Sequence, residues 1–334
     1  MTAKSKIIKP SSVVLLAFLL LTVRAGKTLG QGQNAQGPPT SEAKILLTAV
    51  DKDGRFVNSL RVEDLRVLQD GVPQKVDGLQ KISDRSLSLA ILIDTSASQE
   101  RALPGQRLAA NSFLDSVIRP NRDQVAIATF TGTLTIEQNL TNDLPALRRA
   151  IARAVFVPPP GYVRGGLIVG PPPPVSRAPG VPALGTAVWD VVIDACDNVL
   201  SQSPRETRRA IIVLTDGQDT MSRNKMSTAV DRAVRDEVAI YGIGIGDDSM
   251  YGLNKDGLRK LSERTGGRAF FPGKISELTR IFAEIGQELR TQYLISYSPA
   301  KSAGGAGKIK IEVVNPELRK SDVQLFYQQI VPNK

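Results

Sequence analysis

The feature that most constrains the fold is an apolar run that ends at a carboxylate. Residues Leu87–Ile93 are mostly aliphatic, and Asp94, Ser96 and Ser98 follow them directly. A short apolar run of this kind is typical of a strand that is buried on both faces. An acid and two hydroxyls at alternate positions add little to packing, but they are the oxygen ligands that Mg²⁺ prefers. The segment therefore predicts a strand whose carboxyl end holds a hard cation.

Two later segments strengthen this prediction. Gly185 and Thr186 open an apolar helix, and the apolar run Ala210–Thr215 ends at Asp216. In an open parallel sheet, ligands bind at the carboxyl ends of the strands. Three separate loops would therefore bring one set of oxygen-bearing side chains together, namely Asp94, Ser96, Ser98, Thr186 and Asp216.

This set, in this order, resembles the metal-ion-dependent adhesion site of von Willebrand factor A domains. Asp94, Ser96 and Ser98 match the first loop of that site, Thr186 matches the second loop, and Asp216 matches the third. The resemblance covers roughly residues 86–290. It implies an α/β fold with a doubly wound, mostly parallel sheet and helices on both faces, in a Rossmann-like arrangement.

The resemblance also implies a function. The site would hold a divalent cation, Mg²⁺ or else Mn²⁺ or Ca²⁺, and the cation would bind an Asp or Glu carboxylate of a protein partner. We therefore expect a non-enzymatic, adhesion-type binding module. Over its mature length the chain is similar to bacterial secreted proteins of the von Willebrand factor A-related group.

Two alternatives to this function stay open. The first is a haloacid-dehalogenase-like phosphotransferase with Asp94 as its nucleophile, although Ser96 occupies the position of the second acid that such enzymes need. The second is a von Willebrand factor A scaffold that no longer binds metal.

Strand-like segments flank the central domain of residues 86–290. The N-terminal flank, residues 43–84, and the C-terminal flank, residues 291–334, each contain three such runs, and the pair Asp70-Gly71 is a hairpin signal. The runs are Lys44–Val50, Asp64–Gln69, Val72–Val76, Gln292–Ser298, Lys308–Val314 and Val323–Gln329. Because neither flank alone has enough strands to bury a core, we expect them to pair as one small β-sandwich that carries the central domain as an insertion.

The N-terminus is typical of an export signal. Residues 1–30 begin with lysines, continue with the apolar run Val13–Val23 and end with small residues. The uncharged stretch between Lys9 and Arg24 has 14 residues, fewer than the 18 or more of a membrane-spanning helix. We expect a signal peptide at residues 1–30 and a flexible linker at residues 31–42. The mature protein would then be exported, to the periplasm, cell surface or medium, without a transmembrane helix; an uncleaved anchor is the alternative.

A proline-rich segment interrupts the alternation of strands and helices. Residues 157–182 contain nine prolines, which can neither pair into the sheet nor continue a helix. We expect a surface insertion that joins the fold just before Thr186. It would be either a spacer or a flap that contacts the partner.

Composition excludes several other functions. The chain has no histidine, which removes Ser-His-Asp and Cys-His catalysis, and its single cysteine, Cys196, cannot form an intrachain disulfide. The net charge is +10, but five basic residues and no acid lie in residues 1–30, so 38 basic and 33 acidic residues remain after them. No long basic run accompanies this small excess. We therefore expect no nucleic-acid partner.

Overall fold

The computed structural model describes residues 43–158, 163–164, 167–168, 185–204, 206–246, 252–299 and 307–331. All of them belong to one compact unit, residues 40–334. The predicted signal peptide, the predicted linker and most of the predicted proline-rich insertion lie outside the described residues. Within the insertion, strands β8 (Val163–Arg164) and β9 (Leu167–Ile168) pair with each other as a separate two-stranded sheet.

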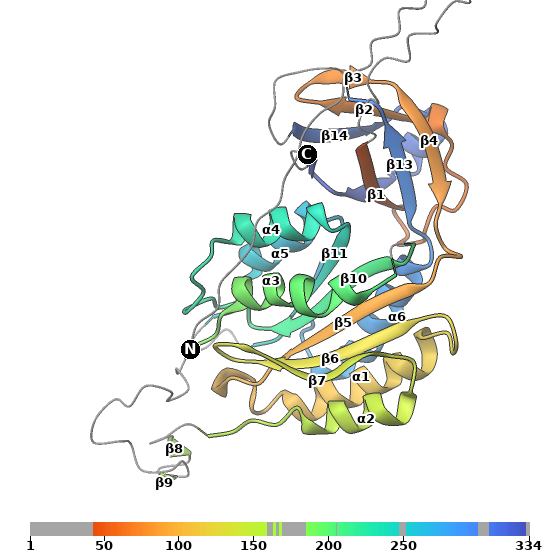
Figure 1. Ribbon diagram of the computed structural model, residues 1–334. Coiled ribbons are helices and arrows are strands. Elements are labelled where there is room, and N and C mark those ends of the chain that lie inside the picture. The colour runs from red at the N-terminus through yellow and green to blue at the C-terminus, as the bar shows by residue number, and fades with distance from the viewer. Residues whose placement is uncertain are drawn as a thin grey trace, which may run out of the picture. The chain divides into compact units, whose positions relative to one another are not determined.

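The central domain is built on a six-stranded sheet with the order β12-β11-β10-β5-β6-β7 (Figure 1). Every neighbouring pair is parallel except β6 and β7, which form an antiparallel hairpin. The strands are β5 (Leu87–Asp94), β6 (Gln124–Phe130), β7 (Leu134–Thr141), β10 (Arg208–Thr215), β11 (Val238–Gly244) and β12 (Ala269–Phe270). The predicted doubly wound, mostly parallel sheet is confirmed.

Helices cover both faces of this sheet because its strands are apolar on both sides. Along β5, Leu89, Ile91 and Ile93 enter one core, and Ala90 and Leu92 enter the other, as the alternation of a strand requires. The first core is closed by α1 (Leu103–Val117), α2 (Leu144–Arg153) and α6 (Leu278–Leu289). The second is closed by α3 (Val188–Asn198), α4 (Met226–Arg235) and α5 (Lys255–Arg264).

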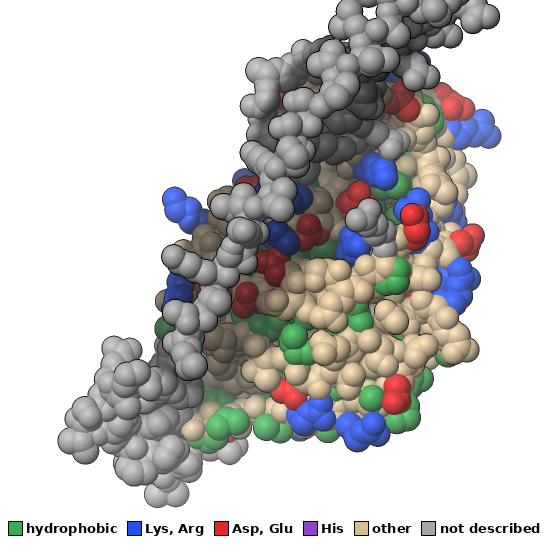
Figure 2. All heavy atoms as spheres, in the orientation of Figure 1, with side chains coloured by type: hydrophobic (Ala, Val, Ile, Leu, Met, Phe, Trp, Pro, Cys, Tyr) green, Lys and Arg blue, Asp and Glu red, His purple; other side chains and the backbone are tan. Residues whose placement is uncertain are grey.

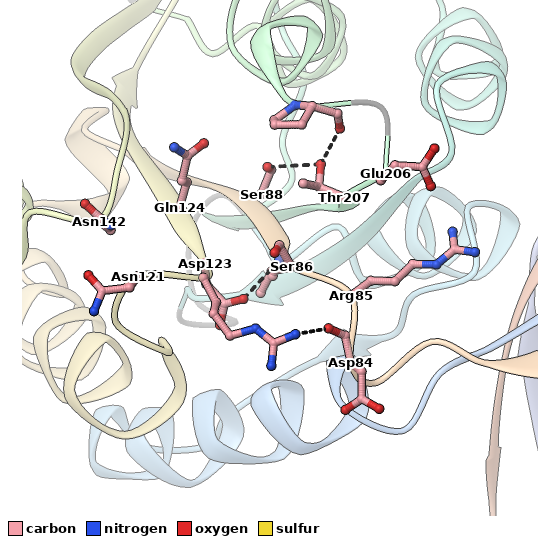
Figure 3. A pocket seen from close by; sticks show the side chains of 13 residues that line it. Asp84, Arg85, Ser86, Ser88, Asn121, Asp123, Gln124, Asn142, Glu206 and Thr207 are labelled. Atoms are coloured by element: carbon pink, nitrogen blue, oxygen red, sulfur yellow. Dashed lines mark hydrogen bonds between the residues drawn. The ribbon is translucent and has the colours of Figure 1, made fainter.

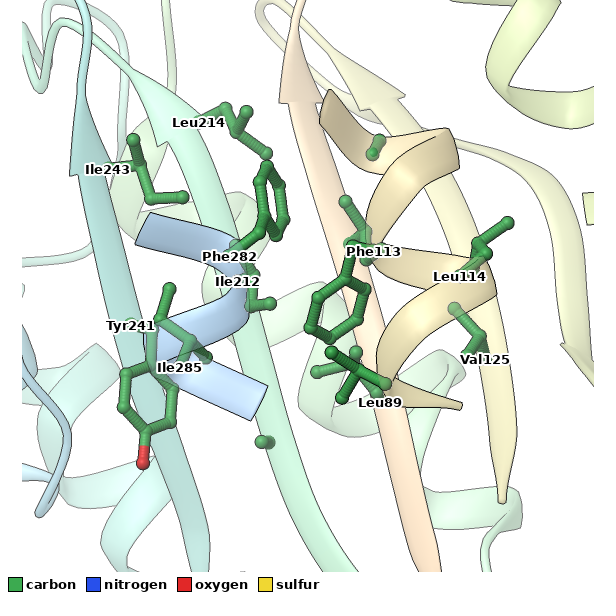
Figure 4. Close-up of a cluster of buried hydrophobic side chains, with 14 of the residues drawn as sticks. Leu89, Phe113, Leu114, Val125, Ile212, Leu214, Tyr241, Ile243, Phe282 and Ile285 are labelled. Carbon is green, nitrogen blue, oxygen red and sulfur yellow. The ribbon is translucent and has the colours of Figure 1, made fainter. Parts of the chain in front are cut away.

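Two aromatic side chains from different helices pack against each other in the first core. Phe113 of α1 and Phe282 of α6 are buried, and their ring centroids lie 5.1 Å apart in a tilted arrangement (Figure 4). Tilted aromatic pairs at this separation are favourable beyond the area that they bury. Both helices are thereby fixed against the strands that end at the candidate site.

The flanks form two antiparallel four-stranded sheets, with the orders β15-β1-β13-β4 and β16-β14-β2-β3. Their strands are β1 (Ala43–Val50), β2 (Leu65–Gln69), β3 (Val72–Gln74), β4 (Val76–Lys81), β13 (Tyr293–Tyr297), β14 (Gly307–Val313), β15 (Gln324–Tyr327) and β16 (Ile330–Val331). A short helix, α7 (Pro316–Lys320), precedes β15. Both sheets share one apolar core, in which Ile45 and Val67 of the N-terminal flank pack with Ile295 and Ile311 of the C-terminal flank. The predicted β-sandwich from both flanks is confirmed.

Two differences from the predicted elements bear on the sandwich and on the candidate site. The run Val72–Val76 is not one strand: the chain leaves the sheet after β3 and begins β4 in the other sheet at Val76, where β4 pairs with β13. The helix predicted from Thr186 begins only at Val188. The reason is that the Thr186 carbonyl oxygen accepts from the N–H groups of Thr220 and Met221, while the N–H of Asp190, its partner in a longer helix, donates to Ser222 instead.

The central domain joins the sandwich through neighbouring strands. β4 leads into β5, and α6 leads back into β13, which pairs with β4 in the register Tyr293 to Lys81. The two chain segments that connect the sandwich to the central domain therefore lie side by side, next to β4 and β13 (Figure 1). In the part of the chain that the structure covers, no helix is both long enough and apolar enough to span a bilayer.

Candidate metal-binding site

The first loop places an acid at the end of β5 and two hydroxyls after it. Asp94 is fully buried, and its Oδ1 accepts a hydrogen bond of 2.9 Å from the backbone N–H of Ser96. The Oγ atoms of Ser96 and Ser98 lie 3.1 Å apart. Ser98 is exposed, whereas Ser96 is partly buried. The loop therefore sets a pair of adjacent hydroxyls between the buried acid and the solvent.

The third loop reaches the first because β10 runs parallel to β5. Leu214 pairs with Ile93, so Thr215 stands beside Asp94 at the ends of the two strands. The Thr215 hydroxyl donates to Asp94 Oδ2 at 2.6 Å and accepts the N–H of Gly217 at 3.1 Å. Gly217 has a φ of +75°, a conformation that favours glycine, and it turns the chain directly after the second acid.

Asp216, the second acid, is also buried, with 4% of its surface exposed. Its Oδ1 accepts the N–H of Gln218 at 2.9 Å, and its backbone oxygen accepts the N–H of Asn254 at 2.9 Å. The charge of this carboxylate is near enough to Asp94 to raise the pKa of Asp94. Two buried acids from two strands thus share one end of the sheet.

The second loop is tied to the third by hydrogen bonds at Thr186. Its N–H donates to the Thr220 hydroxyl at 3.0 Å, and its carbonyl oxygen accepts from the N–H groups of Thr220 and Met221 at 2.9 and 3.1 Å. A Cβ at Gly185 would lie only 2.3 Å from the Met221 side chain and 2.5 Å from that of Thr220. Only glycine therefore allows the two loops to approach so closely.

A further network fixes the start of α3 against the third loop. The Ser222 hydroxyl accepts the N–H groups of Trp189 and Asp190 at 3.0 and 3.1 Å and donates to Asp219 at 2.5 Å. These two N–H groups belong to the first turn of the helix, which has no partners for them of its own. Asp219, to which the sequence assigned no ligand role, supports this network. Trp189 is buried in the second core.

The electrostatics of the two acids suit a cation. Burial raises the pKa of Asp94 to about 6; hydrogen bonds from Ser96 and Thr215 oppose this rise, and the charge of Asp216 adds to it. A cation bound nearby would oppose this rise and favour the ionised form of Asp94. The carboxylate and hydroxyl oxygens are also the donors that a hard divalent cation takes. The residues present therefore fit such an ion.

The site depends on hydroxyl oxygens as much as on acids. Among the residues that the structure covers, no three histidine, cysteine, aspartate or glutamate side chains gather as a possible metal cluster. Asp94, Ser96 and Ser98 lie at alternate positions of one segment, Asp216 follows β10 near Asp94, and the backbone of Thr186 is joined to the loop of Asp216.

The sequence interpretation gave Thr215, Thr220 and Ser222 no role, although all three hold the site together. For Thr215 the signal was present, because it ends the strand next to Asp94 in the predicted parallel sheet. Thr220 and Ser222 lie in an irregular loop, where spacing along the chain says little about contacts.

We expect Thr215→Val to lower the free energy of unfolding by about 1–3 kcal/mol, because it leaves a buried carboxylate oxygen without its donor. Valine keeps the shape of the side chain and removes only the hydroxyl. Thr48→Val is the matched control, since Thr48 is equally buried but its hydroxyl has no hydrogen-bond partner among the described residues. Urea unfolding of the metal-free protein measures both. Equal effects of the two substitutions would contradict the role of Thr215.

A separate cavity of about 440 Å³ lies at the opposite end of the sheet, where β5 and β6 begin (Figure 3). Several of its polar groups satisfy one another: Ser88 bonds to Thr207 at 3.2 Å, and Asp123 accepts the N–H of Leu87 at 2.9 Å. A strand rises by about 3.3 Å per residue, so the two ends of β5 lie roughly 23 Å apart. The cavity is therefore no part of the candidate metal site.

Comparison with known proteins gives one family match. Residues 184–284 match the model of the von Willebrand factor type A domain. A search of curated proteins gives no match.

Several solved structures are similar. Proximal thread matrix protein 1 from the mussel byssus aligns with a TM-score of 0.48 and 18% identity over 64% of this chain and 48% of that one. This chain thus spans about half the length of the mussel protein. A second structure of that protein, described as having a zinc-occupied MIDAS motif, aligns with a TM-score of 0.47 and 17% identity over 67% and 50% of the two chains. A von Willebrand factor type A protein from Catenulispora acidiphila aligns with a TM-score of 0.48 and 12% identity over 88% and 75%.

The family match begins just before Thr186 and runs through β10, Asp216 and most of α6. It therefore covers β10, β11 and β12 of the doubly wound sheet, which β5, β6 and β7 complete, with β5 beside β10. This chain contains a von Willebrand factor type A domain.

Proposed function

We propose that this protein is a divalent-cation-dependent, protein-binding module of an exported bacterial protein. The cation would be held by Asp94, Ser96, Ser98, Thr186 and Asp216. The observation that carries the proposal is the joining of three loops by hydrogen bonds around two buried acids and a pair of adjacent hydroxyls.

The charge of the site explains why it would bind a partner. Three of the five side chains are neutral hydroxyls, and an acid that acts through a bound water neutralises a dication only in part. Mg²⁺ also prefers six oxygen ligands and commonly keeps some positions for water. The bound ion would therefore retain affinity for an anionic oxygen from outside, and an Asp or Glu carboxylate of another protein supplies one. Mg²⁺ is the first choice of ion, with Mn²⁺ and Ca²⁺ as alternatives; the zinc of the mussel protein adds a fourth ion to test.

The same site is poorly equipped for catalysis. The chain has no histidine to act as a base near neutral pH. Both oxygens of Asp94 accept hydrogen bonds, from Ser96 and Thr215, which suits a fixed ligand better than a nucleophile. Domains of this family are generally interaction modules. We therefore expect no release of phosphate from an aryl phosphate, which the phosphotransferase alternative requires.

Calorimetric titration of the mature protein with Mg²⁺, Mn²⁺, Ca²⁺ and Zn²⁺ tests the proposal. We expect one ion per chain and no measurable binding in Asp94→Ala, since the variant removes a charged ligand of the proposed site. Circular dichroism should show that the variant stays folded. Asp219→Asn is the matched control: it removes a nearby negative charge but keeps an amide oxygen that can accept from Ser222, and it should keep the affinity of the wild type.

Unchanged heats in both Asp94→Ala and Asp216→Ala would rule out the proposed site. The partner is then sought by affinity capture from the cell envelope, with divalent cation or with chelator. Capture that the chelator does not reduce would argue against a cation-mediated contact.

Export is tested separately, by sequencing the N-terminus of the protein recovered outside the cytoplasm.

A further inference from the structure

Two glutamines are buried directly behind the first metal loop. Gln99 follows Ser98 in the chain, and Gln106 lies one turn into α1; neither side chain is exposed. Gln99 Nε2 donates to the backbone oxygen of Ile245 at 2.8 Å, and Gln99 Oε1 accepts from Gln106 Nε2 at 2.9 Å. The two amides thus form a relay that runs from α1, through the metal loop, to the residue after β11.

Ile245 joins this relay to the other acid-bearing strand. Its N–H donates to the backbone oxygen of Thr215 at 2.9 Å, and its carbonyl oxygen accepts from Gln99. The hydroxyl of the same Thr215 donates to Asp94. One residue at the end of β11 is therefore bonded to both the first and the third loop.

Burying a side-chain amide is unfavourable in free energy, because the group loses its hydrogen bonds to water. A leucine of similar size would fill either position without that penalty. The contacts of Gln99 instead satisfy its donor and its acceptor with partners on two different elements. A polar relay at this position is therefore better explained by the geometry that it imposes on the loop than by packing.

The backbone hydrogen bonds of the first metal loop are mostly local. Between Asp94 and α1, the loop is held by short turns, such as Gln99 N–H to the Ser96 oxygen at 3.0 Å and Ala102 N–H to the Gln99 oxygen at 2.9 Å. These bonds shape the loop but do not connect it to the third loop. The Gln99 side chain connects the loop to Ile245, whose N–H donates to the backbone oxygen of Thr215 just before Asp216.

We propose that Gln99 and Gln106 are positioning residues, which hold the Ser96 and Ser98 hydroxyls in register with Asp216. The inference rests on the proposed function, because it concerns the affinity of that same metal site. Groups that orient metal ligands from behind commonly change affinity by about 10–100-fold when they are removed.

The test uses the full mature chain and Mg²⁺ or Mn²⁺ alone. We expect Gln99→Leu to weaken cation binding by at least ~10-fold, and Gln106→Leu, which acts through Gln99, to weaken it less. In the double variant, Gln106→Leu should add nothing further. Gln292→Leu is the matched control: Gln292 is also buried, but its amide donates to the Tyr241 hydroxyl away from the metal loops. That variant should lose stability and keep the wild-type affinity.

A second measurement separates positioning from a general loss of stability and needs no metal. Amide hydrogen exchange of residues 96–99 in the metal-free protein should be faster in Gln99→Leu than in Gln292→Leu. If Gln99→Leu does not fold, Gln106→Leu carries the same comparison, since it removes only the donor to Gln99. A loss of affinity no greater than that of Gln292→Leu, or unchanged exchange in the loop, overturns the inference. If the wild type binds no cation, the proposed function fails, and the exchange rates alone decide the role of the two glutamines.

Discussion

Ending the chain after Arg290 is expected to abolish the β-sandwich. The cut removes β13, which stands between β1 and β4, and β14, which stands between β16 and β2. β1 and β4 then have no strand to pair with, and only the short hairpin of β2 and β3 remains of the other sheet. An isolated two-stranded hairpin is at best marginally stable in water.

The loss of apolar burial is the larger effect. Tyr293, Ile295 and Ile311 belong to the removed segment and pack against Ile45 and Val67. Burial of one large aliphatic side chain contributes about 1.5–3 kcal/mol, so the loss of several such contacts approaches the whole stability of a small domain, about 5–15 kcal/mol. We expect residues 43–290 to aggregate and to lose antiparallel β signal in circular dichroism.

A fragment of residues 86–290 is the contrasting sample. Both cores of the central sheet lie almost entirely within it; only Leu46, Ile82 and Leu294 of the first core lie outside. We expect this fragment to be soluble and to bind the cation with the affinity of the full chain. Sedimentation velocity compares the two samples. A monomeric, fully folded 43–290 would show that the two flanks do not depend on each other.

The central sheet could be predicted because its strands are buried on both faces. Leu87–Ile93 and Ala210–Thr215 are continuous apolar runs, and such runs belong to parallel strands covered by helices. Each run ends at an acid, and parallel strands present their carboxyl ends on one edge. The convergence of Asp94 and Asp216 therefore followed from pattern and topology alone.

Strand β4 of the sandwich was harder to predict from the sequence. β4 has an irregular burial pattern, in which Asp77 is exposed and Val76, Gly78 and Leu79 are partly buried, so it lacks a clean alternation. The change of sheet between Gln74 and Val76 depends on which partner each strand finds, and that partner, β13, lies more than 200 residues away in the chain.

The buried glutamines could not be found by pattern. Gln99 and Gln106 lie near serines and charged residues, where a polar side chain is ordinarily solvated. Their burial accompanies hydrogen bonds to each other and to Ile245, a residue distant in the chain, and such tertiary contacts have no local signal. The same holds for Gly185, whose need for a missing Cβ becomes visible only when Met221 is placed beside it.

An arginine at the junction of the two parts of the protein gives the second large prediction. Arg268 lies over the rings of Phe270 in the central domain and Phe326 in the sandwich, at 4.9 and 4.8 Å from their centroids. Its guanidinium also donates to Glu284 at 2.9 Å and to Glu288 at 3.1 Å. One side chain therefore joins β12, α6 and β15.

Glu288 makes this arginine necessary. The carboxyl group is fully buried, and that burial raises its pKa from 4.5 to about 7, although the charge and hydrogen bond of Arg268 and a hydrogen bond from Tyr241 oppose the rise. Between these two values the folded protein holds a proton that the unfolded chain releases. The contribution of Glu288 to stability is therefore largest below pH 4.5 and falls as the pH rises to 7.

We expect Arg268→Ala to lower the free energy of unfolding by about 3–5 kcal/mol at pH 8, because it leaves a buried carboxylate without its counter-charge. Without Arg268 the pKa of Glu288 rises further, so the loss should shrink toward pH 5, where Glu288 is protonated. Arg280→Ala is the matched control: Arg280 is exposed and pairs with Glu284 at 3.3 Å, and its loss should cost less than about 1 kcal/mol at either pH.

Urea unfolding at pH 5 and pH 8 measures these effects, and a third variant assigns their cause. In Glu288→Gln the group can no longer ionise, so Arg268→Ala made in that background should cost nearly the same at both pH values. The loss of stability that is still measured in this background would report the lost contacts with Phe270 and Phe326. A pH-dependent loss that persists in the Glu288→Gln background would place the titrating group elsewhere. A loss of equal size at pH 5 and pH 8 in the single variant would mean that the stacking of Arg268 between the two rings, rather than its charge, holds the central domain to the sandwich.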